Sequence, residues 1–99
     1  MKNIEIKLEI EGKEKIFSCT KVKGILLRKT AEVMKVFEKM SNEFNPDILD
    51  ELVNYVVEVF GSQFTKEEFY DGIDLDEMVL TIQNVANEIM EKATSKLKN

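Results

Sequence analysis

The chain has 99 residues, enough for one small domain with its own hydrophobic core. Its 14 basic and 19 acidic residues give a net charge of −5, which does not favour nucleic acid or an anionic membrane as a partner. Histidine is absent, which excludes imidazole-based nucleophilic, acid–base and metal chemistry.

The single cysteine, Cys19, excludes an internal disulfide and a cysteine-rich zinc site, as expected in a reducing cytosolic compartment. We expect Cys19 to act as a small buried hydrophobic residue. Nearby Lys21 and Lys23 leave a reactive thiol open as the alternative. The N-terminus lacks the apolar segment of a signal peptide, and no apolar run is long enough for a membrane span.

The first expected element is a β-hairpin over residues 3–20. In residues 3–10, aliphatic side chains alternate with charged ones, the pattern of a strand with one buried and one solvated face. Gly12 can take the positive φ of a tight turn, and residues 14–20 suit a returning strand. Because an isolated two-stranded hairpin is marginally stable, we expect it to pack on helices or on another protein.

Helices are expected over residues 25–93, because apolar residues recur there at three- and four-residue spacing. The four predicted helices cover residues 25–40, 46–60, 66–71 and 75–93. Residues 94–99 are predicted to form a flexible polar tail. No linker or repeat divides the chain, so the predicted fold class is α+β: an N-terminal β-hairpin followed by about four helices in a single small domain, residues 1–99.

The last three predicted helices share the same N-terminal signals. Asn45, Thr65 and Asp74 are candidate N-cap residues, and Glu68 and Glu77 complete capping boxes with the latter two. Apolar pairs that can pack across these starts are Phe44 with Leu49, Phe64 with Phe69, and Ile73 with Met78. The expected inward faces are Leu49, Leu52, Val53, Val56, Val57 and Phe60 in the second helix, and Met78, Val79, Ile82, Val85, Ala86, Ile89, Met90 and Ala93 in the fourth.

The acidic stretch over residues 71–77 suggests a calcium loop, but neither possible register places oxygen ligands at the required positions. A helix that ends at Gly72 and a new helix capped by Asp74 explain the stretch better. Carboxylates that face each other across a cleft, as in glycosidases, are not expected in so small a chain. No catalytic residue, no cofactor and no metal site is therefore predicted.

Charge is distributed unevenly along the chain. Residues 1–42 carry a net charge of +4, residues 43–91 a charge of −12, and residues 92–99 a charge of +3. Such a chain could stack head to tail, so we expect salt-sensitive self-association. The basic residues around the first helix are Lys21, Lys23, Arg28, Lys29, Lys35 and Lys39, which form either a solvated helix face or an electrostatic docking face. The candidate interface residues are Arg28, Lys29, Lys35, Asp71, Asp74, Asp76 and Glu77.

Residues 50–65, DELVNYVVEVFGSQFT, followed by EFYDGID at residues 68–74, resemble the tail assembly chaperones of long-tailed phages and prophages of Gram-positive bacteria. That family has an N-terminal β-hairpin, a helix that ends in a Val-Val-x-x-Phe-like run, then Gln-Phe-Thr and a Tyr-Asp-Gly turn before the last helix. The resemblance covers nearly the whole chain and is specific over about residues 50–80.

The resemblance implies a non-enzymatic protein that binds and solubilises the tape measure protein and helps to recruit tail tube subunits. It also implies a location in the cytoplasm of the bacterial host and absence from the mature virion. Two alternatives stay open. One is a small acidic adaptor or regulatory protein that binds a single protein partner, and the other is an acidic mimic of nucleic acid with carboxylates spaced like phosphates.

Overall fold

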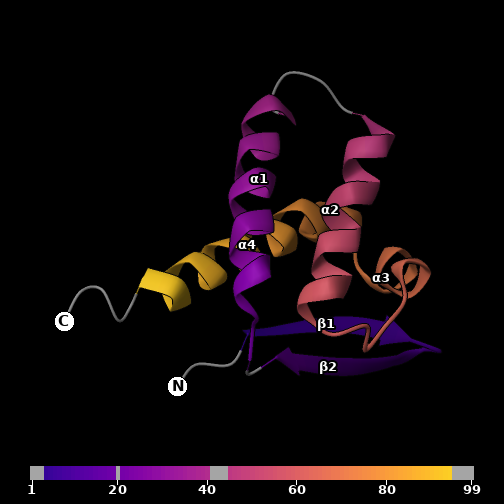
Figure 1. Ribbon diagram of the computed structural model, residues 1–99. Coiled ribbons are helices and arrows are strands. Elements are labelled where there is room, and N and C mark those ends of the chain that lie inside the picture. Colours follow the sequence, from indigo (N-terminus) through magenta and orange to yellow (C-terminus); the bar gives the residue numbers. More distant parts are fainter. Residues whose placement is uncertain (1–3, 20, 41–44, 95–99) are drawn as a thin grey trace.

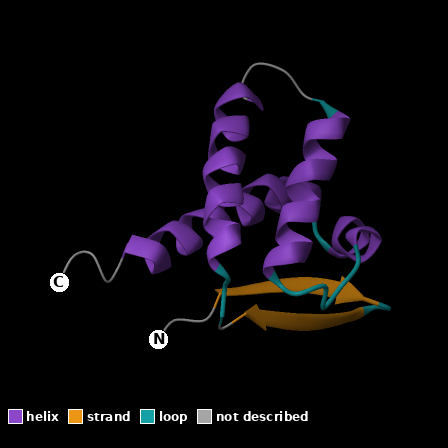
Figure 2. Ribbon diagram, viewed as in Figure 1, coloured by secondary structure: helices purple, strands orange, loops and turns teal. Residues whose placement is uncertain are grey.

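The computed structural model describes residues 4–19, 21–40 and 45–94. These residues form two strands followed by four helices (Figures 1 and 2). The elements are β1 (Ile4–Ile10), β2 (Lys13–Cys19), α1 (Gly24–Met40), α2 (Pro46–Val59), α3 (Lys66–Gly72) and α4 (Leu75–Thr94). The predicted α+β class is confirmed, and each described boundary lies within one residue of the prediction. Residues 3, 20 and 95–99 of the predicted hairpin and tail lie outside the described residues.

The hairpin is antiparallel, and a two-residue loop joins its strands. Ile10 pairs with Lys13, and the register continues to the pair Ile4 and Cys19. Glu11 and Gly12 form the turn with φ values of 54° and 77°. Positive φ at both central residues is type I′ geometry, which matches the twist of the two strands. As predicted, Ile4, Ile6 and Leu8 are buried and the side chains between them are exposed.

All four helices lie on one side of the hairpin (Figure 2). α1 and α2 stand side by side, α3 lies next to α2, and α4 crosses behind α1 and α2 (Figure 1). The core fills the space between the inner face of the hairpin and these helices, and its largest fully buried side chains are Phe60, Phe69, Leu8, Leu52, Ile82, Val53, Val56 and Val85. Among the described residues, no helix combines the length and the apolar character needed to cross a membrane.

The inward face of α2 is broader than predicted. Leu52, Val53 and Val56 are buried as expected, whereas Tyr55 and Val59 are buried without having been predicted. α2 contacts α1, α3 and α4, so several neighbours cover a wide arc of its surface.

The inward face of α4 is narrower than predicted. Met78, Ile82, Val85, Ala86 and Ile89 are buried as expected. The prediction was wrong for Val79, which is 42% exposed, and for Ala93, which is also exposed. The last turns of α4 extend past the other helices (Figure 1), which agrees with the exposure of Ala93 near the end of α4. Ends of long helices are often left uncovered in this way because the burial pattern depends on the neighbours as well as on the helical period.

Capping fixes two of the helix starts. Asn45 Oδ1 accepts the N–H of Asp47 at 2.9 Å before α2. Thr65 and Glu68 form a reciprocal capping box before α3, with hydrogen bonds of 2.8 and 3.0 Å. The rings of Phe64 and Phe69 stack with centroids 6.2 Å apart, which confirms the apolar pair predicted there. Phe44, the predicted partner of Leu49, lies outside the described residues.

Candidate functional site

The basic candidate residues lie on α1, and one of them is used within the fold. Lys29 Nζ donates to both carboxylate oxygens of Glu58 on α2, at 2.9 and 2.6 Å. The two side chains are 43% and 48% exposed, so this ion pair contributes at most about 1 kcal/mol. Arg28 and Lys35 are exposed on the same helix. Lys29 therefore links α1 to α2, while Arg28 and Lys35 are available to a partner.

The acidic candidate residues lie at the junction of α3 and α4 and are all exposed: Asp71, Asp74, Asp76 and Glu77. The structure brings two of them together, because Asp74 and Glu77 line one hollow of about 460 Å³ on the outer face of the hairpin. Glu9 and Glu14 line the same hollow. The acidic and basic candidates therefore form two separate groups, with α2 between α1 and α3 (Figure 1).

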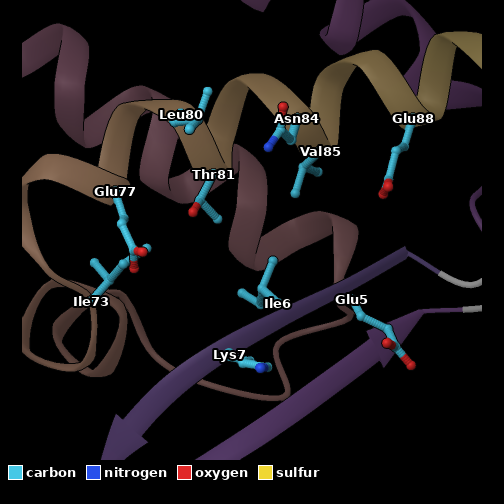
Figure 3. Close-up of a pocket in the computed structure, with 10 residues that line it drawn as sticks. All are labelled: Glu5, Ile6, Lys7, Ile73, Glu77, Leu80, Thr81, Asn84, Val85 and Glu88. Atoms are coloured by element: carbon cyan, nitrogen blue, oxygen red, sulfur yellow. The ribbon is translucent and has the colours of Figure 1, made fainter.

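A groove of about 340 Å³ lies between β1 and α4 (Figure 3). Its apolar lining comes from Ile6 of β1, from Ile73 between α3 and α4, and from Leu80 and Val85 of α4. Its polar and charged lining consists of Glu5, Lys7, Glu77, Thr81, Asn84 and Glu88. In Figure 3, Thr81 and Val85 point from α4 toward β1. Of the predicted interface residues, Glu77 is the one that reaches this groove.

Sequence analysis missed this groove because its two walls come from opposite ends of the chain. One signal was present: Leu75 and Leu80 are apolar residues outside the predicted inward face of the last helix. Leu75 is 87% exposed and Leu80 is 56% exposed. Exposed large apolar residues that have no role in the core suggest a surface for protein contact.

Further apolar side chains are exposed on other elements: Ile16 on β2, and Ile25 and Leu27 on α1. A second hollow, of about 390 Å³, separates α1 from α4, and half-buried Met34 and Phe37 line it. Methionine adapts its shape to different neighbours. The helical body therefore presents several apolar contact points between charged side chains.

Two tyrosine hydroxyls are fixed by hydrogen bonds between helices. The hydroxyls of Thr30 and Tyr55 lie 2.5 Å apart, and because Thr30 donates its hydrogen to the Leu26 carbonyl at 2.7 Å, Tyr55 donates to Thr30. Burial raises the pKa of Tyr55. Tyr70 donates to Asp50 Oδ1 at 2.5 Å, and burial together with this carboxylate raises its pKa to about 12. Both hydroxyls therefore keep their protons at neutral pH and link helices.

Cys19 is buried, as predicted. Its Sγ lies 3.2 Å from the carbonyl oxygen of Val59 and 3.3 Å from that of Lys21. These contacts place the thiol between the last residue of α2 and the segment that precedes α1. In the part of the chain that the structure describes, no group of three or more Asp, Glu or Cys side chains is arranged to hold a metal ion.

The residues that carry the family resemblance have structural roles. Phe64 contacts Phe17, Phe60 and Phe69, with ring centroids 5.0 to 6.2 Å apart. Gly72 approaches the backbone of β1 so closely that a Cβ there would lie 2.7 Å from the carbonyl oxygen of Glu9. The Tyr-Asp-Gly turn therefore docks α3 on α2 through Tyr70 and on the hairpin through Gly72.

Comparison with known proteins agrees with this structural pattern. A family described as phage tail chaperone protein matches residues 1–99, the whole chain. No curated protein and no solved structure gave a match. The match includes residues 50–80, the part of the chain over which the resemblance is specific. This chain belongs to the phage tail chaperone family.

Proposed function

We propose that this protein binds the phage tape measure protein, keeps it soluble before the tail is built, and helps to recruit tail tube subunits to it. Membership of the phage tail chaperone family supports a role in tail assembly. The observation that favours binding of an apolar partner is the set of large side chains exposed on α4, namely Leu75, Val79 and Leu80. A folded domain gains nothing from exposing such residues, whereas a chaperone needs them for contact.

We propose further that the protein acts by binding and without catalysis. It has no histidine. Within residues 4–19, 21–40 and 45–94, the titratable groups with displaced pKa values are Tyr55 and Tyr70, and both are engaged in hydrogen bonds that join helices. A protein that shields an apolar partner needs a soluble, charged surface around its apolar contact points, and 33% of the residues here are charged.

The proposed role places the protein in the cytoplasm of the bacterial host, where tails are assembled, and leaves it out of the finished virion. It also suggests that several copies act together along one long partner. The separation of the basic group on α1 from the acidic group at the junction of α3 and α4 supports head-to-tail contact between copies, positive face on negative face.

Co-expression with the tape measure protein of the same phage tests the proposal. We expect the tape measure protein to move from the insoluble to the soluble fraction and to co-purify with the chaperone. The double substitution Leu75→Ser and Leu80→Ser should abolish this rescue, because it removes two exposed apolar contacts. The matched control is Gln83→Ser, which changes an exposed polar residue of the same helix.

Each outcome has a definite meaning. If the unmodified chain does not solubilise the tape measure protein, the proposed function is wrong. If the double variant is as effective as the unmodified chain, the contact does not involve the exposed face of α4. Co-purification of one unrelated protein would favour an adaptor, and co-purification of a DNA-binding protein would favour a nucleic-acid mimic.

A further inference from the structure

The outer edge of β1 has no neighbouring strand among the described residues, because the sheet consists of β1 and β2. The two-residue turn makes Ile10 and Lys13 a hydrogen-bonded pair. Since such pairs alternate along an antiparallel ladder, the N–H and C=O groups of Glu5, Lys7 and Glu9 point away from β2. This edge therefore presents main-chain donors and acceptors to whatever lies beside it.

Two contacts agree with this register. A Cβ added at Gly72 would lie 2.7 Å from the backbone O and 3.1 Å from the backbone N of Glu9, so the end of α3 covers the edge at Glu9. On the opposite edge, Gln63 Nε2 donates to the carbonyl oxygen of Ser18 at 2.9 Å, which shows that this carbonyl points away from β1. In the described structure, neither a close backbone approach nor a side-chain hydrogen bond covers the edge of β1 around Glu5 and Lys7.

The groove between β1 and α4 lies directly beside this uncovered stretch (Figure 3). A strand added to β1 would place alternate side chains beneath α4, against Ile73 and Val85, with Leu80 at the rim of the groove. Ile73 is half-buried, so an apolar row from an added strand would bury surface that the chain itself leaves open. The other row would lie on the outer face of the sheet, next to Glu5 and Glu9.

The charges around the groove indicate the charge of the partner that it binds. Glu5, Glu77 and Glu88 line it. The adjoining hollow, which shares Lys7, Ile73 and Glu77 with the groove, adds three more carboxylates, those of Glu9, Glu14 and Asp74. Among the described residues that line the two hollows, Lys7 is the one cation. An acidic surface of this kind favours a basic partner.

We propose that this groove binds an extended segment of a partner protein in which apolar and basic residues alternate, and that the segment joins the outer edge of β1 as a third strand. Main-chain hydrogen bonds to Glu5 and Lys7 supply affinity, and the apolar and acidic linings supply specificity. The inference rests on the proposed function, because it takes the ligand of this groove to be a protein. It assigns a contact site on this chain for that partner.

The probe is an acetylated and amidated heptapeptide of alternating lysine and valine, with a glutamate–valine heptapeptide as its control. We expect the lysine peptide to bind and the glutamate peptide not to bind. Binding should slow hydrogen exchange at the amides of Glu5 and Lys7, because both N–H groups would donate hydrogen bonds to the added strand. NMR spectroscopy of the labelled chain reads both binding and exchange.

Proline substitutions test the two edges of the hairpin separately. Lys7→Pro removes an outward N–H and blocks strand addition to β1 without removing a bond to β2. Its matched control is Ile16→Pro, the directly paired position on β2, which alters the opposite edge in the same way. We expect Lys7→Pro to weaken peptide binding by about tenfold or more and Ile16→Pro to leave it unchanged. Loss of Lys7 makes the groove more acidic, so weaker binding of a basic peptide could not come from charge.

A charge reversal tests the groove without altering the strand. Glu77→Lys should weaken binding of the lysine peptide about tenfold, whereas Glu32→Lys, an exposed residue of α1 away from the groove, should have little effect. Absence of binding, equal binding to Lys7→Pro and the unmodified chain, or binding of the peptide as a helix would each overturn the inference. Peptide binding without rescue of the tape measure protein would overturn the proposed function alone.

Discussion

Gly72 shows how one residue fixes the position of a helix. Its φ is an ordinary one, so glycine is required there for space and not for a left-handed backbone. A Cβ at this position would lie 2.7 Å from Glu9 O, 3.1 Å from Glu9 N and 3.1 Å from Leu8 Cβ. Two of these neighbours are backbone atoms of a paired strand, which cannot move aside without disturbing the hairpin.

Gly72→Ala is therefore expected to lower the free energy of unfolding by about 1–3 kcal/mol, the usual range for an overpacked core site. Urea denaturation monitored by circular dichroism measures this change. Gly24→Ala is the matched control, because no heavy atom lies within 4 Å of its added Cβ and alanine favours the helix that begins there. Equal stability of the two variants would contradict the close approach of α3 to β1.

Lys29 forms an ion pair that could not be predicted from the sequence. Its position on the basic face of a predicted helix made it a candidate for docking. Its partner Glu58 lies 29 positions away along the chain, on the next helix. Cys19, by contrast, could be interpreted correctly from its strand and its apolar neighbours, because burial of a small residue depends mainly on the local pattern.

Among the elements, α3 depends most on its contacts because it has seven residues. A helix of this length is not stable alone. The capping box of Thr65 and Glu68 fixes its start, Phe69 anchors it in the core, and Tyr70 bonds it to Asp50 of α2. The hydroxyl of Tyr70 must be protonated to donate to a carboxylate, so this link depends on pH.

The pKa of Tyr70 is raised from 10.0 to about 12 in the folded protein. A raised pKa means that the folded state holds the proton more tightly than the unfolded state, so the link stabilises the fold fully below pH 10 and is lost as the pH rises toward 12. We expect Tyr70→Phe to lower the unfolding free energy by about 1 kcal/mol at pH 7. We expect the difference between the two proteins to shrink above pH 10.

Chemical denaturation at a series of pH values measures this difference. The double variant Tyr70→Phe and Asp50→Asn is the control, because Asp50→Asn should cost little once the hydroxyl is gone. A difference between Tyr70→Phe and the unmodified chain that stayed constant from pH 7 to pH 12 would contradict the predicted role of this bond.

The order and the ends of the elements could be predicted because their signals are local. Asn45 and Thr65 cap helices where the sequence places them, and Gly12 closes the turn with positive φ. The burial of Tyr55 and the exposure of Val79 could not be predicted, because they depend on which helices cover α2 and α4. The groove between β1 and α4 was missed for the same reason.

For the molecule as a whole, the net charge of −5 conceals a division into regions of opposite sign. The fold preserves this division, because Arg28 and Lys35 are exposed on α1 while Asp71 and Asp76 are exposed at the junction of α3 and α4. α2 lies between these two surfaces (Figure 1). A molecule with its charges separated in this way can present each surface to a different neighbour.

We expect the chain to self-associate at low ionic strength and to dissociate at high ionic strength, because salt screens contacts between exposed charges. Light scattering across a salt series measures this. Arg28→Glu with Lys35→Glu removes most of the positive charge of the α1 surface, and Asp71→Lys with Asp76→Lys offsets the charges of Asp74 and Glu77 at the junction of α3 and α4, so neither variant should self-associate. Mixed together at low salt, the two variants should associate again, because the native acidic surface of one can face the native basic surface of the other. A chain that remains monomeric at high concentration and low salt would contradict head-to-tail association.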